Sequence, residues 1–112
     1  MSDCIFCKII AGEIPSRKVY EDEEVFVFHD IHPFARVHVL IIPKAHIASL
    51  ADCGPEHEKI LGKMLALAPR LARDAGLESG FKTLINTGRG GGQEVFHIHI
   101  HVFGGGDPAP RH

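Results

Sequence analysis

Residues 97–103 read His97-Ile98-His99-Ile100-His101-Val102-Phe103, and this stretch decides how the chain folds. Histidine and aliphatic residues alternate strictly, which is the period of a β-strand whose two faces differ. We therefore predict a strand over Val95–Phe103, with the three imidazoles on one face and the aliphatic side chains packed into a core. The outer two imidazoles would be about 13 Å apart, too far to share one metal ion with the middle one.

Further elements are predicted on both sides of this strand. Four short apolar runs predict four more strands, at Val19–Tyr20, Val25–His29, Val37–Ile42 and Phe81–Ile85. Apolar residues at helical spacing predict a short helix within residues 4–12 and one long helix from Gly54-Pro55 to Gly76. Pro69 inside the long helix predicts a bend or a restart there. The connections are too short for parallel crossovers, so we predict an α+β fold with a five-stranded antiparallel sheet.

The composition is that of a globular protein with one domain over residues 1–112 and a short tail at 104–112. The chain has 112 residues, of which 45% are hydrophobic and 23% charged, and a formal net charge of -2. No block of basic residues is present to hold a nucleic-acid backbone, and the longest apolar run, Val37–Pro43, is too short to span a membrane. We expect no nucleic-acid or membrane partner and, because the start does not resemble a secretory signal, a cytoplasmic protein.

Nine histidines accompany one tyrosine and no tryptophan, so the chemistry is sought among the histidines. A row of imidazoles suits phosphoryl or nucleotidyl transfer, because a neutral ring nitrogen can attack phosphorus while its neighbours donate to the oxygens and the leaving group. The alternative is a set of exposed strand histidines without function. Upstream, the loop Gly88–Gln93 could bring backbone N–H groups to an anion, or it could be a flexible glycine hairpin.

The three cysteines do not form a disulfide framework, because their number is odd and Cys4 and Cys7 lie in a C-x-x-C pair apart from Cys53. On its own, this pair is compatible with a metal site, with buried thiols or with a redox pair. A domain of this size buries only about two-thirds of its unfolded surface. Oligomerisation or a structural metal would therefore be a natural supplement to the core.

Several motifs together resemble the histidine triad family, in its branch of nucleoside phosphoramidases. The signature His-x-His-x-His followed by apolar residues is found at 97–103. The resemblance extends over nearly the whole chain, through Ile5–Ile10, Glu13–Pro15, Phe28–Ile31, His38–Ile47, Asn86-x-Gly88 and Gly91–Val95. It implies the antiparallel sheet and long helix described above, with the sheet continued into a second copy across a two-fold axis of a homodimer.

The resemblance implies a hydrolase that cleaves the P–N bond of purine nucleoside 5′-phosphoramidates, such as AMP joined to an amine. His99 would be the nucleophile and would form a covalent nucleoside-monophosphate intermediate. His101 and His38 would contact the phosphate and move the proton to the leaving amine. The alternatives are a dinucleoside polyphosphate hydrolase or nucleotidyl transferase of the same family, and a non-catalytic regulator that binds purine nucleotides.

The resemblance also implies a set of nucleotide-binding residues. Asp30 would accept the ribose hydroxyls, as an acceptor-only carboxylate can. An apolar slot for the base would consist of Ile5, Phe6, Ile9, Phe28 and Ile31, each of which is also a credible core residue. The phosphate and leaving-group side would be formed by Asn86, Gln93, Glu94 and Val95. Glu94 departs from some relatives, which carry serine at this position.

A structural Zn²⁺ is implied as well, with the ligands Cys4, Cys7, His46 and His97. Some family members lack both cysteines, so the ion would be structural and no cofactor would be required for the chemistry. The homodimer would use a paired edge strand and the apolar face of the long helix, Met64 and Leu67 among it.

Overall fold

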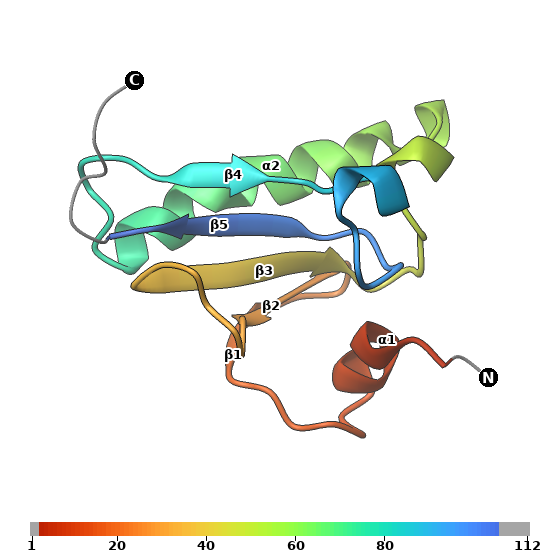
Figure 1. The fold of residues 1–112 in the computed structure, drawn as a ribbon, viewed down its shortest axis with the longest axis horizontal. Coiled ribbons are helices and arrows are strands. Elements are labelled where there is room, and N and C mark those ends of the chain that lie inside the picture. Colours follow the sequence, from red (N-terminus) through yellow and green to blue (C-terminus); the bar gives the residue numbers. More distant parts are fainter. Residues whose placement is uncertain (1–2, 106–112) are drawn as a thin grey trace.

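The computed structural model describes residues 3–105, which form an antiparallel sheet with the strand order β1-β2-β3-β5-β4 (Figure 1). The strands are β1 Lys18–Glu21, β2 Val25–His29, β3 Val37–Pro43, β4 Lys82–Leu84 and β5 Ile100–Gly104. The helices are α1 Ile5–Ile10 and α2 Glu58–Asp74, and short 3-10 turns lie at Leu50–Asp52, Pro55–His57 and Arg89–Gly91. The predicted α+β fold, with five antiparallel strands, one long helix and a short N-terminal helix, is confirmed.

The two faces of the sheet carry two separate apolar clusters. The valines of β2 pack towards α2, whereas its phenylalanines pack towards α1 on the opposite face. Ile100 and Val102 of β5 belong to the α2 cluster and are 0% exposed. Because neighbouring side chains of a strand point to opposite faces, His101 lies on the α1 face. The alternation of β5 thus sends its imidazole to the side where α1 stands apart from the sheet in Figure 1.

Helix α1 is held against this face by its own apolar side chains. Phe6 and Ile9 are buried, and the Phe6 ring packs edge-on against Phe28 with centroids 5.4 Å apart. At the start of the helix the side chain of Cys4 caps the backbone, because its Sγ accepts a hydrogen bond from the N–H of Cys7 at 3.4 Å. This short helix therefore fixes the positions of both cysteines, and its side chains Phe6 and Ile9 form one wall of the cavity described below.

The strand predicted over Val95–Phe103 is wrong at its beginning, because β5 starts only at Ile100. Strands β3 and β5 pair with Ile41 opposite Ile100. Continuing this register would place Pro43 opposite Ile98, and proline has no N–H to donate to a ladder. The backbone before β5 forms a hydrogen bond outside the sheet instead, in which the N–H of Ile98 donates to the carbonyl of Ile47 at 2.7 Å.

The tail predicted at 104–112 begins later than expected. Gly104 is the last residue of β5 and pairs with Val37 of β3. The remainder of this prediction, residues 106–112, lies outside the described residues.

Helix α2 follows the 3-10 turn at Pro55–His57 and continues through Pro69 without a restart. Met64 is 0% exposed and lies in the core between α2 and the sheet. The prediction that Met64 contributes to a contact between two copies is therefore wrong, because its side chain is already enclosed within one chain. Within residues 3–105, no helix combines the length and the apolar character that crossing a bilayer requires.

Candidate active site

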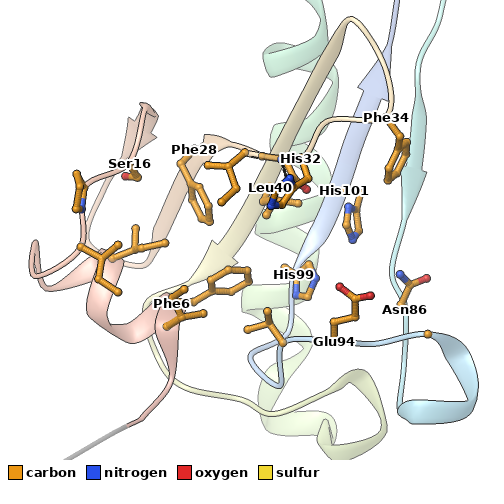
Figure 2. Close-up of a pocket in the computed structure, with 18 residues that line it drawn as sticks. Phe6, Ser16, Phe28, His32, Phe34, Leu40, Asn86, Glu94, His99 and His101 are labelled. Carbon is orange, nitrogen blue, oxygen red and sulfur yellow. Dashed lines mark hydrogen bonds between the residues drawn. The ribbon is translucent and has the colours of Figure 1, made fainter.

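A cavity of about 450 Å³ opens on the α1 side of the sheet (Figure 2). Its apolar end is lined by Ile5, Phe6, Ile9 and Phe28. Its polar end is lined by Asn86, Glu94, His99 and His101. Asp30 and Ile31, which follow β2, and Val95 also line it. The fold thus brings together most of the residues that the sequence assigned to one nucleotide site, although Ile31 is 80% exposed.

His99 lies in the middle of the cavity wall, between an aromatic ring and a second imidazole. Its Nδ1 lies 2.8 Å from the carbonyl oxygen of His97, and burial lowers the pKa of its ring. A neutral ring with this contact carries its proton on Nδ1, where it donates to the carbonyl. Nε2 is then the ring nitrogen that has a lone pair, as a nucleophile requires.

His101 is hydrogen-bonded to His38, which comes from the neighbouring strand β3. Nε2 of His38 lies 2.9 Å from Nδ1 of His101, and the backbone N–H of Phe34 donates to Nδ1 of His38 at 3.3 Å. Because Nδ1 of His38 is an acceptor, neutral His38 carries its proton on Nε2 and donates it to His101. His101 then carries its own proton on Nε2.

This pair of imidazoles is neutral near pH 7. Burial is the main cause that lowers the pKa of His38, against the opposing charge of Asp30. Burial, followed by the neighbouring His99 and His38, lowers the pKa of His101 to about 4. His38 is 2% exposed and does not line the cavity, so it acts on the site through His101.

Asp30 links the cavity to this pair. One carboxylate oxygen accepts the N–H of His32 at 2.8 Å, and the other lies 3.4 Å from Nε2 of His38. A carboxylate has about four lone-pair sites, so Asp30 keeps the capacity to accept hydroxyl donors from a ligand.

Gln93 has a different position from the one that the sequence implied. Its side chain is 5% exposed and does not line the cavity. Oε1 accepts the N–H of Gly88 at 2.8 Å, and Nε2 donates to the carbonyls of Ala48 at 2.8 Å and Val95 at 3.0 Å. All polar atoms of the amide are therefore used to hold the glycine loop and the segment before β5.

Sequence reasoning missed Phe34, which lines the cavity and whose ring packs against those of His38 and His101. The ring centroid lies 4.1 Å from that of His38 and 5.9 Å from that of His101, and the side chain is 57% exposed. Phe34 lies in the loop between β2 and β3, where no periodic pattern indicates which way a side chain points. His32 lies in the same loop, lines the same cavity and was missed for the same reason.

The four predicted metal ligands, Cys4, Cys7, His46 and His97, lie together beside the segment that precedes β5. Nδ1 of His97 lies 3.3 Å from Sγ of Cys4, 3.6 Å from Sγ of Cys7 and 3.2 Å from Nδ1 of His46. Sγ of Cys7 lies 3.4 Å from Nδ1 of His46, and all four ligand atoms lie within 4.8 Å of one another. Ligand atoms around tetrahedral zinc are separated by about 3.3 to 3.8 Å, so the donor set and its spacing fit this ion.

The ring of His97 is oriented for metal binding by a second hydrogen bond. Its Nε2 lies 2.8 Å from the carbonyl oxygen of Pro43, and the ring is 0% exposed. Neutral His97 thus has its proton on Nε2 and its Nδ1 lone pair towards the two sulfur atoms, an arrangement typical of a zinc-ligating histidine.

Comparisons with known proteins match nearly the whole chain. The family model described as HIT domain matches residues 11–107. The chain is 60% identical to the protein HitA of Neisseria gonorrhoeae over 104 residues, which cover 93% of this chain and 97% of that protein. It is 48% identical to the purine nucleoside phosphoramidase of Escherichia coli (strain K12) over 104 residues, which cover 92% of this chain and 87% of that protein.

Solved structures share the fold. A HIT family hydrolase from Clostridium thermocellum matches with a TM-score of 0.93 and 45% identity, covering 99% of this chain and 97% of that one. A Zn-bound histidine triad family protein from Mycobacterium smegmatis matches with a TM-score of 0.80 and 43% identity, covering 90% of this chain and 73% of that one.

Proposed function

The chain belongs to the HIT domain family and is a hydrolase, and we propose that it cleaves the P–N bond of purine nucleoside 5′-phosphoramidates through a nucleotidyl-histidine intermediate. The observation that carries the proposal is the hydrogen bond from Nδ1 of His99 to the carbonyl of His97, which leaves the Nε2 lone pair for attack. The similarity to a purine nucleoside phosphoramidase supports the choice of substrate.

In the first step, Nε2 of His99 attacks phosphorus, and the electron pair of the P–N bond passes to the nitrogen of the leaving amine. That nitrogen gains one proton, which is taken up from water as the anionic substrate binds and is delivered through Nε2 of His101. His38 supports this transfer, because its bond to Nδ1 of His101 fixes the orientation of the ring.

In the second step, the oxygen of a water molecule attacks phosphorus. The bond between phosphorus and His99 breaks, and its electron pair returns to Nε2. The proton of the water leaves through Nε2 of His101 to the solvent. The products are the nucleoside monophosphate and the regenerated neutral histidine.

The apolar end of the cavity suits a purine base. Phe6 and Phe28 present ring surfaces there, and Phe6 also lies against His99 with ring centroids 5.1 Å apart. A nucleotide with its base in this slot would have its phosphate beside His99 and its ribose near Asp30.

The reaction class is tested by incubating the protein with adenosine 5′-phosphoramidate and, separately, with a diadenosine polyphosphate. We expect rapid release of AMP from the phosphoramidate. Cleavage of the diadenosine polyphosphate alone would contradict the proposal.

We expect Asp30→Ala to weaken the binding of AMP by roughly tenfold while weakening 2′-deoxy-AMP much less, because the lost contact is to the ribose hydroxyls. Isothermal titration with both nucleotides checks this. The matched variant Glu78→Ala, which removes an exposed carboxylate outside the cavity, serves as the control. Equal losses for the two nucleotides would remove Asp30 from this role.

We propose that Cys4, Cys7, His46 and His97 hold a structural Zn²⁺, which when bound supplies a cross-link rather than chemistry at phosphorus. The similarity to a Zn-bound histidine triad family protein supports this assignment. These ligands join the start of α1 to the segment before β5. The carbonyl of His97 is the acceptor for His99, so fixing His97 also fixes the nucleophile.

We further propose a cytoplasmic homodimer. Cys4, Cys7 and Cys53 form no disulfide with one another, which suits a reducing compartment. Strand β4 is an edge of the described sheet, and Phe81 and Leu84 beside and within it are 38% and 39% exposed. An exposed strand edge with apolar side chains favours pairing with a second copy.

We expect light scattering at micromolar concentration to give about twice the 12.3 kDa mass of one chain. Leu84→Asp should shift the mass towards that of the monomer, because a buried charge opposes pairing of the two edges. Lys18→Asp, which places the same charge on the opposite edge strand, is the control and should leave the dimer intact. A monomer mass for the unmodified protein would contradict the homodimer.

A further inference from the structure

The cavity has an unusual charge balance for a site that receives an anion. Two carboxylates, those of Asp30 and Glu94, line it, whereas no lysine or arginine of the described chain does. His101, the proposed proton donor, offers no fixed positive charge either, since its pKa is lowered to about 4 by burial and its neighbouring imidazoles. The potential that a bound ligand meets is therefore negative, at least in the part of the cavity that residues 3–105 form.

The two carboxylates occupy different places in this cavity. Asp30 lies against His38, on the side expected for the ribose. Glu94 points into the space between His99 and Asn86, away from Phe28 and the apolar slot (Figure 2). With the base in the apolar slot and phosphorus at His99, the space beside Glu94 remains for the leaving group.

The carboxylate of Glu94 is available to a ligand. It is exposed, and among residues 3–105 it makes no hydrogen bond or ion pair that would neutralise it. Glu94 also lines a second, more open groove, which contains Asp3 and Phe96 and to which no lysine or arginine of the described chain contributes. A leaving group longer than the cavity would thus meet further negative charge and an apolar surface along this groove.

We propose that Glu94 makes the leaving-group side of the site selective for amines that carry a second positive charge, such as diamines. The inference rests on the proposed phosphoramidase function and names its substrate class. A cation near this carboxylate gains attraction, whereas an anionic leaving group, including a polyphosphate, meets repulsion from the same charge. Attraction of the cation and repulsion of the anion by this exposed carboxylate each change the specificity constant by about two- to fivefold, so together they separate the two extremes by about tenfold.

The test uses three adenosine 5′-phosphoramidates whose leaving amines match in length and differ in terminal charge: 1,6-diaminohexane, hexylamine and 6-aminohexanoate. Assays are run near pH 8, where the terminal amine and carboxylate of the substrates are both charged. We expect kcat/KM to fall in the order cationic, neutral, anionic, with at least about a tenfold difference between the extremes. The difference should shrink as salt is added, because exposed charges are screened.

The decisive variant is Glu94→Gln, which keeps the size of the side chain and removes its charge. We expect the ratio of kcat/KM between the cationic and anionic substrates to fall to within about threefold of unity. Glu78→Gln removes an exposed carboxylate outside the cavity and should leave the ratio as it is in the unmodified protein. Equal rates for the three substrates, or a ratio that survives Glu94→Gln, would overturn the proposal.

The affinities of the same three compounds for the His99→Ala protein separate this inference from the function on which it rests. Suppose that the unmodified protein hydrolyses none of the three compounds, but the cationic one binds most tightly to His99→Ala and Glu94→Gln in that background removes the preference. The phosphoramidase proposal then fails, and the charge selectivity stands. If the unmodified protein hydrolyses all three compounds equally well and His99→Ala binds them equally well, the selectivity fails and the phosphoramidase proposal stands.

Discussion

Replacing His99 with alanine is expected to lower kcat for adenosine 5′-phosphoramidate by about 10⁴-fold or more. The side chain supplies the atom that forms the bond to phosphorus, and no other described group has a lone pair in the same place. The affinity for AMP should change by less than about tenfold, or 1.4 kcal/mol, because the apolar slot and Asp30 remain. Single-turnover kinetics and titration with AMP measure the two effects separately.

Two further variants make this result specific. His99→Asn retains a side chain that can donate to the carbonyl of His97, and it should lose turnover to the same extent. His57→Asn changes a histidine outside the cavity, whose Nδ1 accepts the N–H of Gly54, and should keep the wild-type rate. Turnover of His99→Ala within a few-fold of wild type would rule out His99 as the nucleophile.

Removing zinc is expected to have the largest effect on stability. A strong chelator should lower the melting temperature by on the order of 10 °C, which for a domain of this size corresponds to about 2 kcal/mol. The cause is loss of the cross-link between the start of α1 and His97. Without the ion, only the packing of α1, a helix of six residues, holds the N-terminal segment in place. Elemental analysis of the purified protein should give about one zinc per chain.

Cysteine variants locate the ion. Cys7→Ser should reduce the zinc content and the melting temperature together, because it removes one of four ligands. Cys53→Ser is the matched control, since Cys53 lies outside the cluster with its Sγ 3.7 Å from the carbonyl of Ser49. Unchanged zinc content in Cys7→Ser, or a metal-free protein of undiminished stability, would refute the site.

The sequence predicts an element well where the deciding signal is local. Strand β2 begins and ends as predicted, at Val25 and His29, because an acidic turn precedes it and Asp30 to Pro33 break it. The predicted start of β5 at Val95 lies five residues before the observed start at Ile100, because the residue that limits the pairing lies in another strand. Pro43 at the end of β3 has no N–H with which to extend the pairing, and local alternation does not contain that information.

In the site too, some features could be predicted from the sequence and others depend on the fold. A resemblance can assign His99, Asn86 and Glu94, which indeed line one cavity. It cannot show that the amide of Gln93 turns towards the backbone of its own loop instead. Phe34 lies in an irregular loop, and only the folded chain shows that its N–H fixes the proton position of His38.

The central claim is the covalent intermediate on His99, and mass spectrometry of the reacting protein tests it most directly. The protein is mixed with adenosine 5′-phosphoramidate, quenched during turnover under conditions that preserve P–N bonds, and digested. We predict an adduct of one adenylyl group on the peptide containing residues 97–103, located at His99 and absent from the His99→Ala protein. Turnover without any such adduct, or an adduct on a different residue, would contradict the account.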